Sequence, residues 1–187
     1  MNVISKKVGK MKLETLESAY RRLTKKKYTT RADLARNCDF SLMTATNVAR
    51  ELIDLGLVFE RKLLHGTRKL SAYDIEYTFV KADLNEITMT VFDKSMKPVR
   101  TDFVRRNFSF PLVEDISIFL QGRYEQSDIF PCLFLGGVPT VELEIFSDLL
   151  PNFALIPDGE KDIKRFMREY MLKSKTEQKA LANITEM

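Results

Sequence analysis

Apolar side chains recur every three or four residues along the first part of the chain, which is the spacing of one face of an α-helix. One such stripe predicts a helix from about Met11 to Lys26 and consists of Leu13, Leu16, Tyr20 and Leu23. Thr30 followed by Asp33 is a capping-box pattern, in which each residue satisfies a backbone amide of the other. The pattern predicts a second, short helix that ends near Asn37.

A third helix is predicted after a tight turn over residues 37–40. Ser41 has the hydroxyl group of a good N-cap, and Gly56 can adopt the left-handed backbone that ends many helices. The helix should therefore run from Ser41 to Leu55. Two short helices joined by a tight turn are typical of a helix-turn-helix.

This third helix has two unlike faces. One face is apolar and consists of Ala45, Val48, Ala49 and Leu52. The opposite face is flanked by Thr44 and Thr46 and consists of Met43, Asn47, Arg50 and Asp54. Asn can bridge the edge of adenine, Arg can bridge that of guanine, and a Met or Thr methyl group can contact the thymine methyl. The free face therefore predicts a helix that reads the major groove, and the alternative is an ordinary solvent-exposed face of a helical bundle.

Two apolar-rich strands follow, Leu57–Leu64 and Lys69–Ile75, around a turn that contains Gly66. A helix-turn-helix followed by a hairpin is a winged helix. The predicted tip of the wing is basic and polar, which suits a phosphate backbone or a narrow minor groove, and it consists of His65, Thr67, Arg68 and Lys69. A solvated loop residue is the alternative for His65, since no neighbour in the sequence suggests an acid–base pair.

Charge is distributed unevenly over the 187 residues. Residues 1–75 contain 16 Lys and Arg against 8 Asp and Glu, a net charge of +8, whereas residues 76–187 contain 14 against 18, a net charge of −4. A basic first half favours a domain that binds a polyanion. A solvated basic face is the alternative that charge alone leaves open.

The second half of the chain mixes strand and helix patterns. Ile87, Met89 and Val91 alternate as in a strand, and a turn follows at Asp93. The later predicted elements are a helix with Val113, Ile116 and Leu120 on one face, a buried strand over residues 129–139, a helix around Val141–Leu150, a short strand around Phe153–Ile156 and a helix from Lys161 to about Ser174. The last helix has an apolar stripe that is predicted to fill its own domain, to contact a partner chain, or both, and that consists of Ile163, Phe166, Met167, Tyr170 and Met171.

Composition excludes several classes of protein. The apolar runs are too short to cross a bilayer, and the first ten residues lack the apolar core of a signal peptide, so we expect a cytoplasmic protein without a membrane partner. Cys38 and Cys132 lie far apart and share the chain with a single His, so the sequence predicts neither a disulfide framework nor a zinc site. No cofactor is predicted.

The first half resembles the N-terminal domain of the ROK family, which pairs sugar-responsive repressors with related sugar kinases. The resemblance rests on "TTRADLARNCDFSLMTATNVARELIDLGLVFE" followed by "GTRK". In that family a Ser-capped recognition helix leads into a Gly-Leu-Val strand entry, and a Gly-Arg-Arg-Pro wing binds the minor groove. Gly66 and Arg68 match the glycine and the second arginine, whereas Thr67 replaces the first arginine and Lys69 replaces the proline.

The resemblance continues over "FVKADLNEITMTVFDKSMKPV", which looks like the first hairpin of the ROK actin-like domain. It implies about one actin-like lobe after the winged helix. The kinases of the family need a glycine-rich phosphate loop after the first strand, and here Asn85 and Glu86 stand where glycines belong. The family's zinc cluster has no counterpart. The resemblance therefore implies a regulator and no enzyme.

The sequence thus predicts an α+β / α/β chain with a winged helix-turn-helix domain over residues 1–75 and an actin-like (ribonuclease H-like) half-domain over residues 76–187. The predicted function is a DNA-binding transcriptional repressor that binds a palindromic operator as a homodimer, paired through the second domain. The alternatives are a protein-interaction module without DNA binding and a relic of a sugar kinase, and the sequence leaves open whether a small-molecule effector binds. The predicted DNA contacts are Ser41, Met43, Thr44, Thr46, Asn47, Arg50, His65, Thr67, Arg68 and Lys69.

Overall fold

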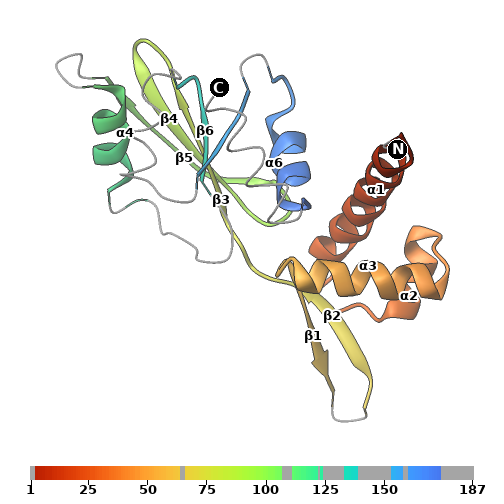
Figure 1. Ribbon diagram of the computed structural model, residues 1–187. Helices are drawn as coiled ribbons and strands as arrows, with labels where there is room; N and C mark the ends of the chain where they lie inside the picture. The colour runs from red at the N-terminus through yellow and green to blue at the C-terminus, as the bar shows by residue number, and fades with distance from the viewer. Residues whose placement is uncertain are drawn as a thin grey trace. The chain divides into compact units, whose positions relative to one another are not determined.

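The computed structural model describes residues 3–63, 66–106, 111–121, 123, 133–138, 153–157 and 160–173. The chain combines α-helices with β-sheets and divides into two compact units (Figure 1). Unit 1 comprises Met1–Asp74 and Arg168–Lys175, and unit 2 comprises Ile75–Met167 and Thr176–Met187. The mixed α and β content agrees with the predicted fold class.

Unit 1 begins with three helices: α1 (Val3–Lys25), α2 (Arg31–Cys38) and α3 (Leu42–Asp54). All three were predicted, although α1 begins about eight residues before the predicted start. The three helices pack against one another. Their contact faces are formed by buried side chains at helical spacing, among them Leu16, Tyr20, Leu23, Leu34, Val48 and Leu52.

An antiparallel hairpin follows α3 and consists of β1 (Val58–Lys62) and β2 (Arg68–Ala72). Both strands are shorter than predicted, although the amide of Tyr73 still donates to the carbonyl of Leu57 beyond their ends. Thr29 joins the hairpin to the helices: its amide donates to the Leu70 carbonyl at 3.0 Å, and the Leu70 amide donates back at 2.8 Å. The segment before α2 therefore forms an isolated bridge with β2.

In the described residues, unit 2 has a sheet of five strands with the order β5-β4-β3-β6-β7. Its strands are β3 (Tyr77–Ala82), β4 (Glu86–Phe92), β5 (Pro98–Arg105), β6 (Leu133–Gly136) and β7 (Phe153–Leu155). The first three pair antiparallel, and β6 and β7 continue the sheet in parallel. Strands β3, β4, β6 and β7 were predicted from the sequence, whereas β5 was not.

The core of unit 2 lies between this sheet and α4 (Leu112–Leu120) (Figure 1). As predicted, Ile87, Met89 and Val91 are buried, because alternate residues of β4 face the helix. The facing side chains of α4 are also buried, among them Val113, Ile116 and Leu120. The hydrophobic periodicity of both elements therefore predicted the core correctly.

Helix α6 (Ile163–Met171) matches the last predicted helix, with ends two or three residues inside the predicted ones. Met167, Tyr170 and Met171 are buried within the chain. Their burial agrees with the part of the prediction in which the stripe packs within its own chain. A contact of the stripe with a partner chain stays a prediction. The predicted helix around residues 141–150 lies outside the described residues.

Gly137 follows β6 with a φ of 74°, a left-handed conformation that favours glycine. A Cβ atom at this position would collide with the carbonyl oxygen of Ala82. The glycine is therefore required by the close approach of two backbone segments at the end of the strand.

Candidate nucleic-acid interface

The candidate interface begins at α2, whose start is fixed by the predicted capping box. The amide of Asp33 donates to the Thr30 hydroxyl at 3.1 Å, and the amide of Thr30 donates to the Asp33 carboxylate at 3.4 Å. The Thr30 hydroxyl also donates to this carboxylate at 2.7 Å. These hydrogen bonds from Thr30 lower the pKa of Asp33.

The turn between α2 and α3 is tighter than predicted. Asp39 adopts a left-handed backbone with a φ of 55°, which Asp tolerates better than most residues, and its amide donates to Ala35. The amide of Phe40 donates to the same carbonyl at 2.9 Å. Ser41 then caps α3, since its hydroxyl oxygen accepts from the Thr44 amide at 3.0 Å.

The two faces of α3 lie as predicted. The apolar face is buried and consists of Ala45, Val48, Ala49 and Leu52. Met43, Asn47, Arg50 and Asp54 are exposed on the other side, and Met43 is 76% exposed. Leu42 is also 60% exposed, so the first turn of α3 presents two large apolar side chains to solvent.

Three of the predicted contact residues are already engaged within α3. The hydroxyl oxygens of Ser41 and Thr44 lie 2.8 Å apart and share a hydrogen bond. The hydroxyl of Thr46 donates to the carbonyl of Leu42 at 2.8 Å. A ligand of this face would therefore find the exposed side chains of Asn47, Arg50 and Asp54 as its polar groups.

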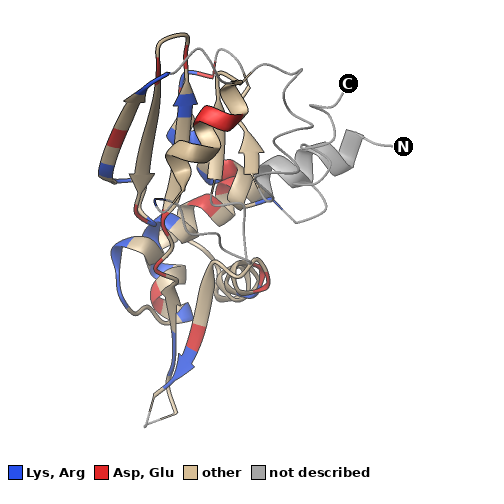
Figure 2. Cartoon of the chain, turned by 90° about the vertical axis from the view of Figure 1, so that its left-hand side faces the viewer, with Lys and Arg blue, Asp and Glu red and all other residues tan. Residues whose placement is uncertain are grey.

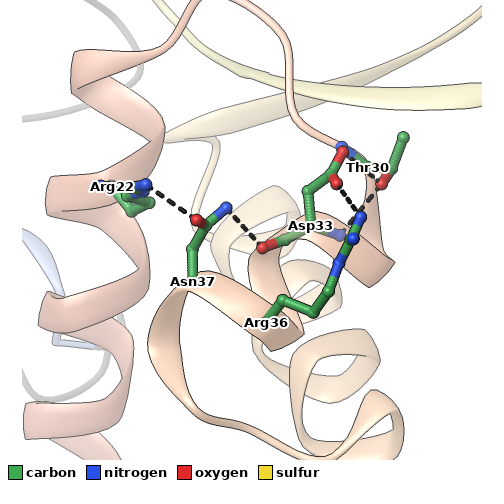
Figure 3. A network of polar contacts seen from close by, with 5 residues as sticks. All are labelled: Arg22, Thr30, Asp33, Arg36 and Asn37. Carbon is green, nitrogen blue, oxygen red and sulfur yellow. Dashed lines mark hydrogen bonds and ion pairs between the residues drawn. The ribbon is translucent and has the colours of Figure 1, made fainter.

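A polar network that the sequence analysis missed joins α1 to α2 (Figure 3). Arg22 donates from Nη2 to Oδ1 of Asn37 at 2.8 Å, and Asn37 donates from Nδ2 to the carbonyl of Asp33 at 2.6 Å. Arg36 forms an ion pair with the carboxylate of Asp33. The capping box of α2 and the contact between the two helices therefore belong to one network.

A second polar cluster links the β1–β2 hairpin to α2. Glu60 lies on β1, and its side chain is 16% exposed. Its carboxylate lies 2.8 Å from Nη1 of Arg31, the first residue of α2, and 3.4 Å from Nη1 of Arg68 on β2. No pattern in the sequence predicts this cluster, because its three members come from separate elements.

The tip of the hairpin carries the second group of predicted contacts. Gly66 has a φ of 78°, which favours glycine, and its amide donates to Leu63 at 2.9 Å. Thr67 and Arg68 are exposed, and Lys69 is half-buried. Figure 2 shows Lys and Arg positions along this hairpin. His65 lies outside the described residues.

The described part of the chain contains neither a cluster of metal ligands nor a membrane-spanning helix. Among the described residues, no group of three or more His, Cys, Asp or Glu side chains is arranged to hold a metal ion. Within the same ranges, no helix is long and apolar enough to cross a membrane.

No family model matches this sequence, and no curated protein matches it. The structure is similar to a solved structure described as the ROK family transcriptional regulator, homolog of the E. coli MLC protein, with 14% identity and a TM-score of 0.49. That match covers 67% of this chain and 35% of the other, so the chain spans about a third of the length of that protein. The solved structure has the family name that the sequence resemblance predicts.

A second similar structure is the Campylobacter jejuni peroxide stress regulator, with 13% identity and a TM-score of 0.37. The match covers 86% of this chain and 99% of the other. At these identities and TM-scores neither similarity assigns a function. The function proposed below therefore rests on the residues of unit 1.

Proposed function

We propose that the chain is a sequence-specific DNA-binding transcriptional regulator whose unit 1 is a winged helix. The observation that carries this proposal is the division of α3 into a buried apolar face and an exposed face with Met43, Asn47 and Arg50. The order of elements, three helices followed by an antiparallel hairpin, supports it. We propose that α3 is the recognition helix.

The exposed groups of α3 have the chemistry that reads base edges. The Asn47 amide can bridge N6 and N7 of adenine, and the Arg50 guanidinium can bridge O6 and N7 of guanine. Met43 is 76% exposed and can contact a thymine methyl group, which is an apolar group in the major groove. The helix would lie in the major groove with its N-terminal half toward the bases.

The hairpin would supply contacts that do not depend on sequence. Arg68 and Lys69 lie at the start of β2 beside the tip, where their charges can reach the phosphate backbone or a narrow minor groove. Glu60 pairs with Arg68 in the free protein, so Arg68 would exchange a carboxylate for a phosphate when DNA binds. The ion pair therefore keeps the guanidinium of Arg68 beside Glu60 until DNA binds.

We propose that unit 2 is an actin-like half-domain without nucleotide chemistry. In the turn between β3 and β4, Oδ1 of Asp83 accepts from the amides of Asn85 and Glu86, at 2.9 Å each. A phosphate-binding loop needs such amides free and no negative charge beside them. The turn therefore binds its own carboxylate, and these hydrogen bonds, first that of Asn85, lower the pKa of Asp83.

A single winged helix makes few base contacts, and two-fold pairing doubles them across a palindromic site. We therefore propose that the regulator acts as a homodimer through unit 2, and as a repressor, because a bound dimer blocks access to its site.

The test is selection of bound fragments from a genomic DNA library, followed by fluorescence anisotropy on the enriched and the scrambled sequence. We expect enrichment of a palindromic motif and tighter binding to it by about a thousandfold or more. Equal affinity for both sequences, or no binding at low salt, would overturn the proposal.

The exposed Leu42 and Met43 favour a second candidate, a protein-interaction module, because adjacent apolar side chains on a surface can mark a protein contact. The same anisotropy experiment separates the two. A protein-interaction module would show no salt-dependent binding to any DNA fragment.

A further inference from the structure

Strand β5 forms one edge of the sheet in unit 2 and pairs on one side with β4. No other strand in the described ranges pairs with its outer side. Arg106 donates its amide to the carbonyl of Asn85 at 2.9 Å, in register with the β4–β5 ladder. Antiparallel strands alternate hydrogen-bonded and non-hydrogen-bonded pairs, so Thr101, Phe103 and Arg105 direct their backbone groups away from β4.

This edge is long and apolar for a strand that faces solvent. Seven of its eight residues are exposed, including Phe103 at 70%, Val99 at 54% and Val104 at 39%. Figure 2 shows basic and acidic positions along the outermost strand of the sheet. An edge of this kind is a template for pairing with another strand.

The side chains of β5 complement a second copy of the same strand in one register. In a two-fold antiparallel pairing about a single residue, residues equally distant from it lie opposite each other. Pairing about Thr101 places Arg100 opposite Asp102 of the second copy, and Val99 opposite its Phe103. Thr101 then faces Thr101, which is a favourable cross-strand pair.

In this register Arg100 and Asp102 of the two copies form a cluster of four charges in which positive and negative groups alternate. Within one chain, Nε of Arg100 lies 3.3 Å from the carboxylate of Asp102, and both side chains are partly exposed. In the pair, each guanidinium would have one carboxylate beside it on its own strand and another across the interface. Opposite charges across strands stabilise a pairing, whereas like charges destabilise it.

The neighbouring registers lack this complementarity. Pairing about Asp102 would place two carboxylates opposite each other and Val99 opposite Arg105. Pairing about Phe103 would place Arg100 opposite Arg106. The register about Thr101 is therefore the one among the three in which Val99 faces Phe103 and Arg100 faces Asp102. Arg105 would face Lys97 of the second copy only beyond Pro98.

We propose that β5 pairs antiparallel with β5 of a second copy of the chain, centred on Thr101. This inference rests on the homodimer of the proposed function and assigns its interface. The β4–β5 register shifts between Val91 and Phe92, which leaves Val99 without a partner on β4, and Pro98 has no amide to donate, so the pairing ends at Val99. The interface is short, and we expect a dimer of modest affinity that the two half-sites of an operator would strengthen.

Sedimentation velocity of the full chain tests the interface through charge reversal. Arg100→Asp and Asp102→Arg each place like charges opposite each other and should weaken self-association by about tenfold. An equimolar mixture of the two variants should associate again, because every opposing pair in the heterodimer is complementary. The double variant should self-associate for the same reason. Lys81→Asp, an equal change of charge at an exposed residue of β3, should have no effect.

Circular dichroism checks that each variant folds, because Nη2 of Arg100 also donates to the carbonyl of Arg123 at 2.9 Å and Arg100→Asp removes this bond. A native chain that sediments as a monomer, or one whose dimer withstands both single reversals, would overturn the inference. DNA anisotropy on the same samples keeps the two proposals apart. A dimer that needs Arg100 and Asp102 in a chain that binds no DNA would support the interface and refute the proposed function.

Discussion

The guanidinium of Arg31 lies 2.8 Å from the carboxylate of Glu60, and this ion pair joins the first residue of α2 to strand β1. The same carboxylate contacts Arg68 on β2 at 3.4 Å. Glu60 is therefore the residue through which α2 and both strands of the hairpin share one charge cluster. Its side chain is 16% exposed, so solvent screens the cluster only in part.

Replacing Glu60 with Gln should have two opposite effects. The free energy of unfolding should fall by about 1–3 kcal/mol, because Arg31 and Arg68 lose a charged partner. Affinity for random DNA should rise by about 0.2–1 kcal/mol, because a negative charge beside Arg68 is removed. Urea unfolding and anisotropy measure the two quantities. Glu14→Gln, at an exposed residue of α1, is the matched control, and equal effects of both variants would contradict the role of Glu60.

Asn47 and Arg50 should contribute to specific binding only. Alanine at either position should cost about 1–3 kcal/mol on the selected sequence and relax the preference at one base pair, because a bidentate contact to a base is lost. Affinity for scrambled DNA should change little. Arg21→Ala removes an arginine that is 59% exposed on α1 and serves as the control. Equal losses on both DNA sequences would reassign Asn47 and Arg50 to the phosphate backbone.

Arg68 and Lys69 should contribute to binding of every sequence. Alanine at each should weaken binding to selected and scrambled DNA alike and reduce the slope of log K against log salt by about 1, since one counterion fewer is released. Lys97→Ala, at an exposed residue of unit 2, should leave the slope unchanged. If the slope of the Arg68 and Lys69 variants stays at the native value, the hairpin lies outside the interface.

The capping box of α2 predicts a pH-dependent stability. Thr30→Ala should cost about 1 kcal/mol near neutral pH, and Thr30→Ser should retain most of the stability. Hydrogen bonds from Thr30 lower the pKa of Asp33 in the folded chain, so their contribution is present above the unfolded pKa and lost as the pH falls through the folded one. The difference in Tm between native and Thr30→Ala should therefore narrow in acid. A constant difference would show that Thr30 stabilises α2 without its bond to the Asp33 carboxylate.

Local patterns explain why α2 and α3 could be predicted closely. Thr30 and Ser41 are capping residues, and Gly56, with a φ of 71°, allows the chain to leave α3. Each signal acts within a few residues and is visible in the sequence. The exposed face of α3 was predicted for the same reason, because its opposite face has a helical apolar period.

Strand β5 could not be predicted in this way, because Pro98–Arg105 is exposed on both faces and so lacks the alternation that marks a half-buried strand. The contact of Arg22 with Asn37 spans 15 residues, and that of Arg31 with Glu60 depends on how a helix meets a hairpin. Such contacts depend on how the elements pack in three dimensions, so they produce no periodic pattern in the sequence. The start of α1 was also missed, since its first residues continue the helix before the apolar stripe begins.

Isothermal titration with magnesium and ATP should show no heat of binding to the full chain. Oδ1 of Asp83 accepts from the Asn85 and Glu86 amides, so the turn after β3 offers a phosphate no free donor at these two positions and a carboxylate in their place. The Asp83→Ser variant should also show no heat of ATP binding, because the Glu86 carboxylate still repels a phosphate in this turn. A sugar panel with phosphate-release detection extends the test to kinase activity. Measurable binding of ATP by the native chain would show that unit 2 retains a nucleotide site and would revive the kinase alternative.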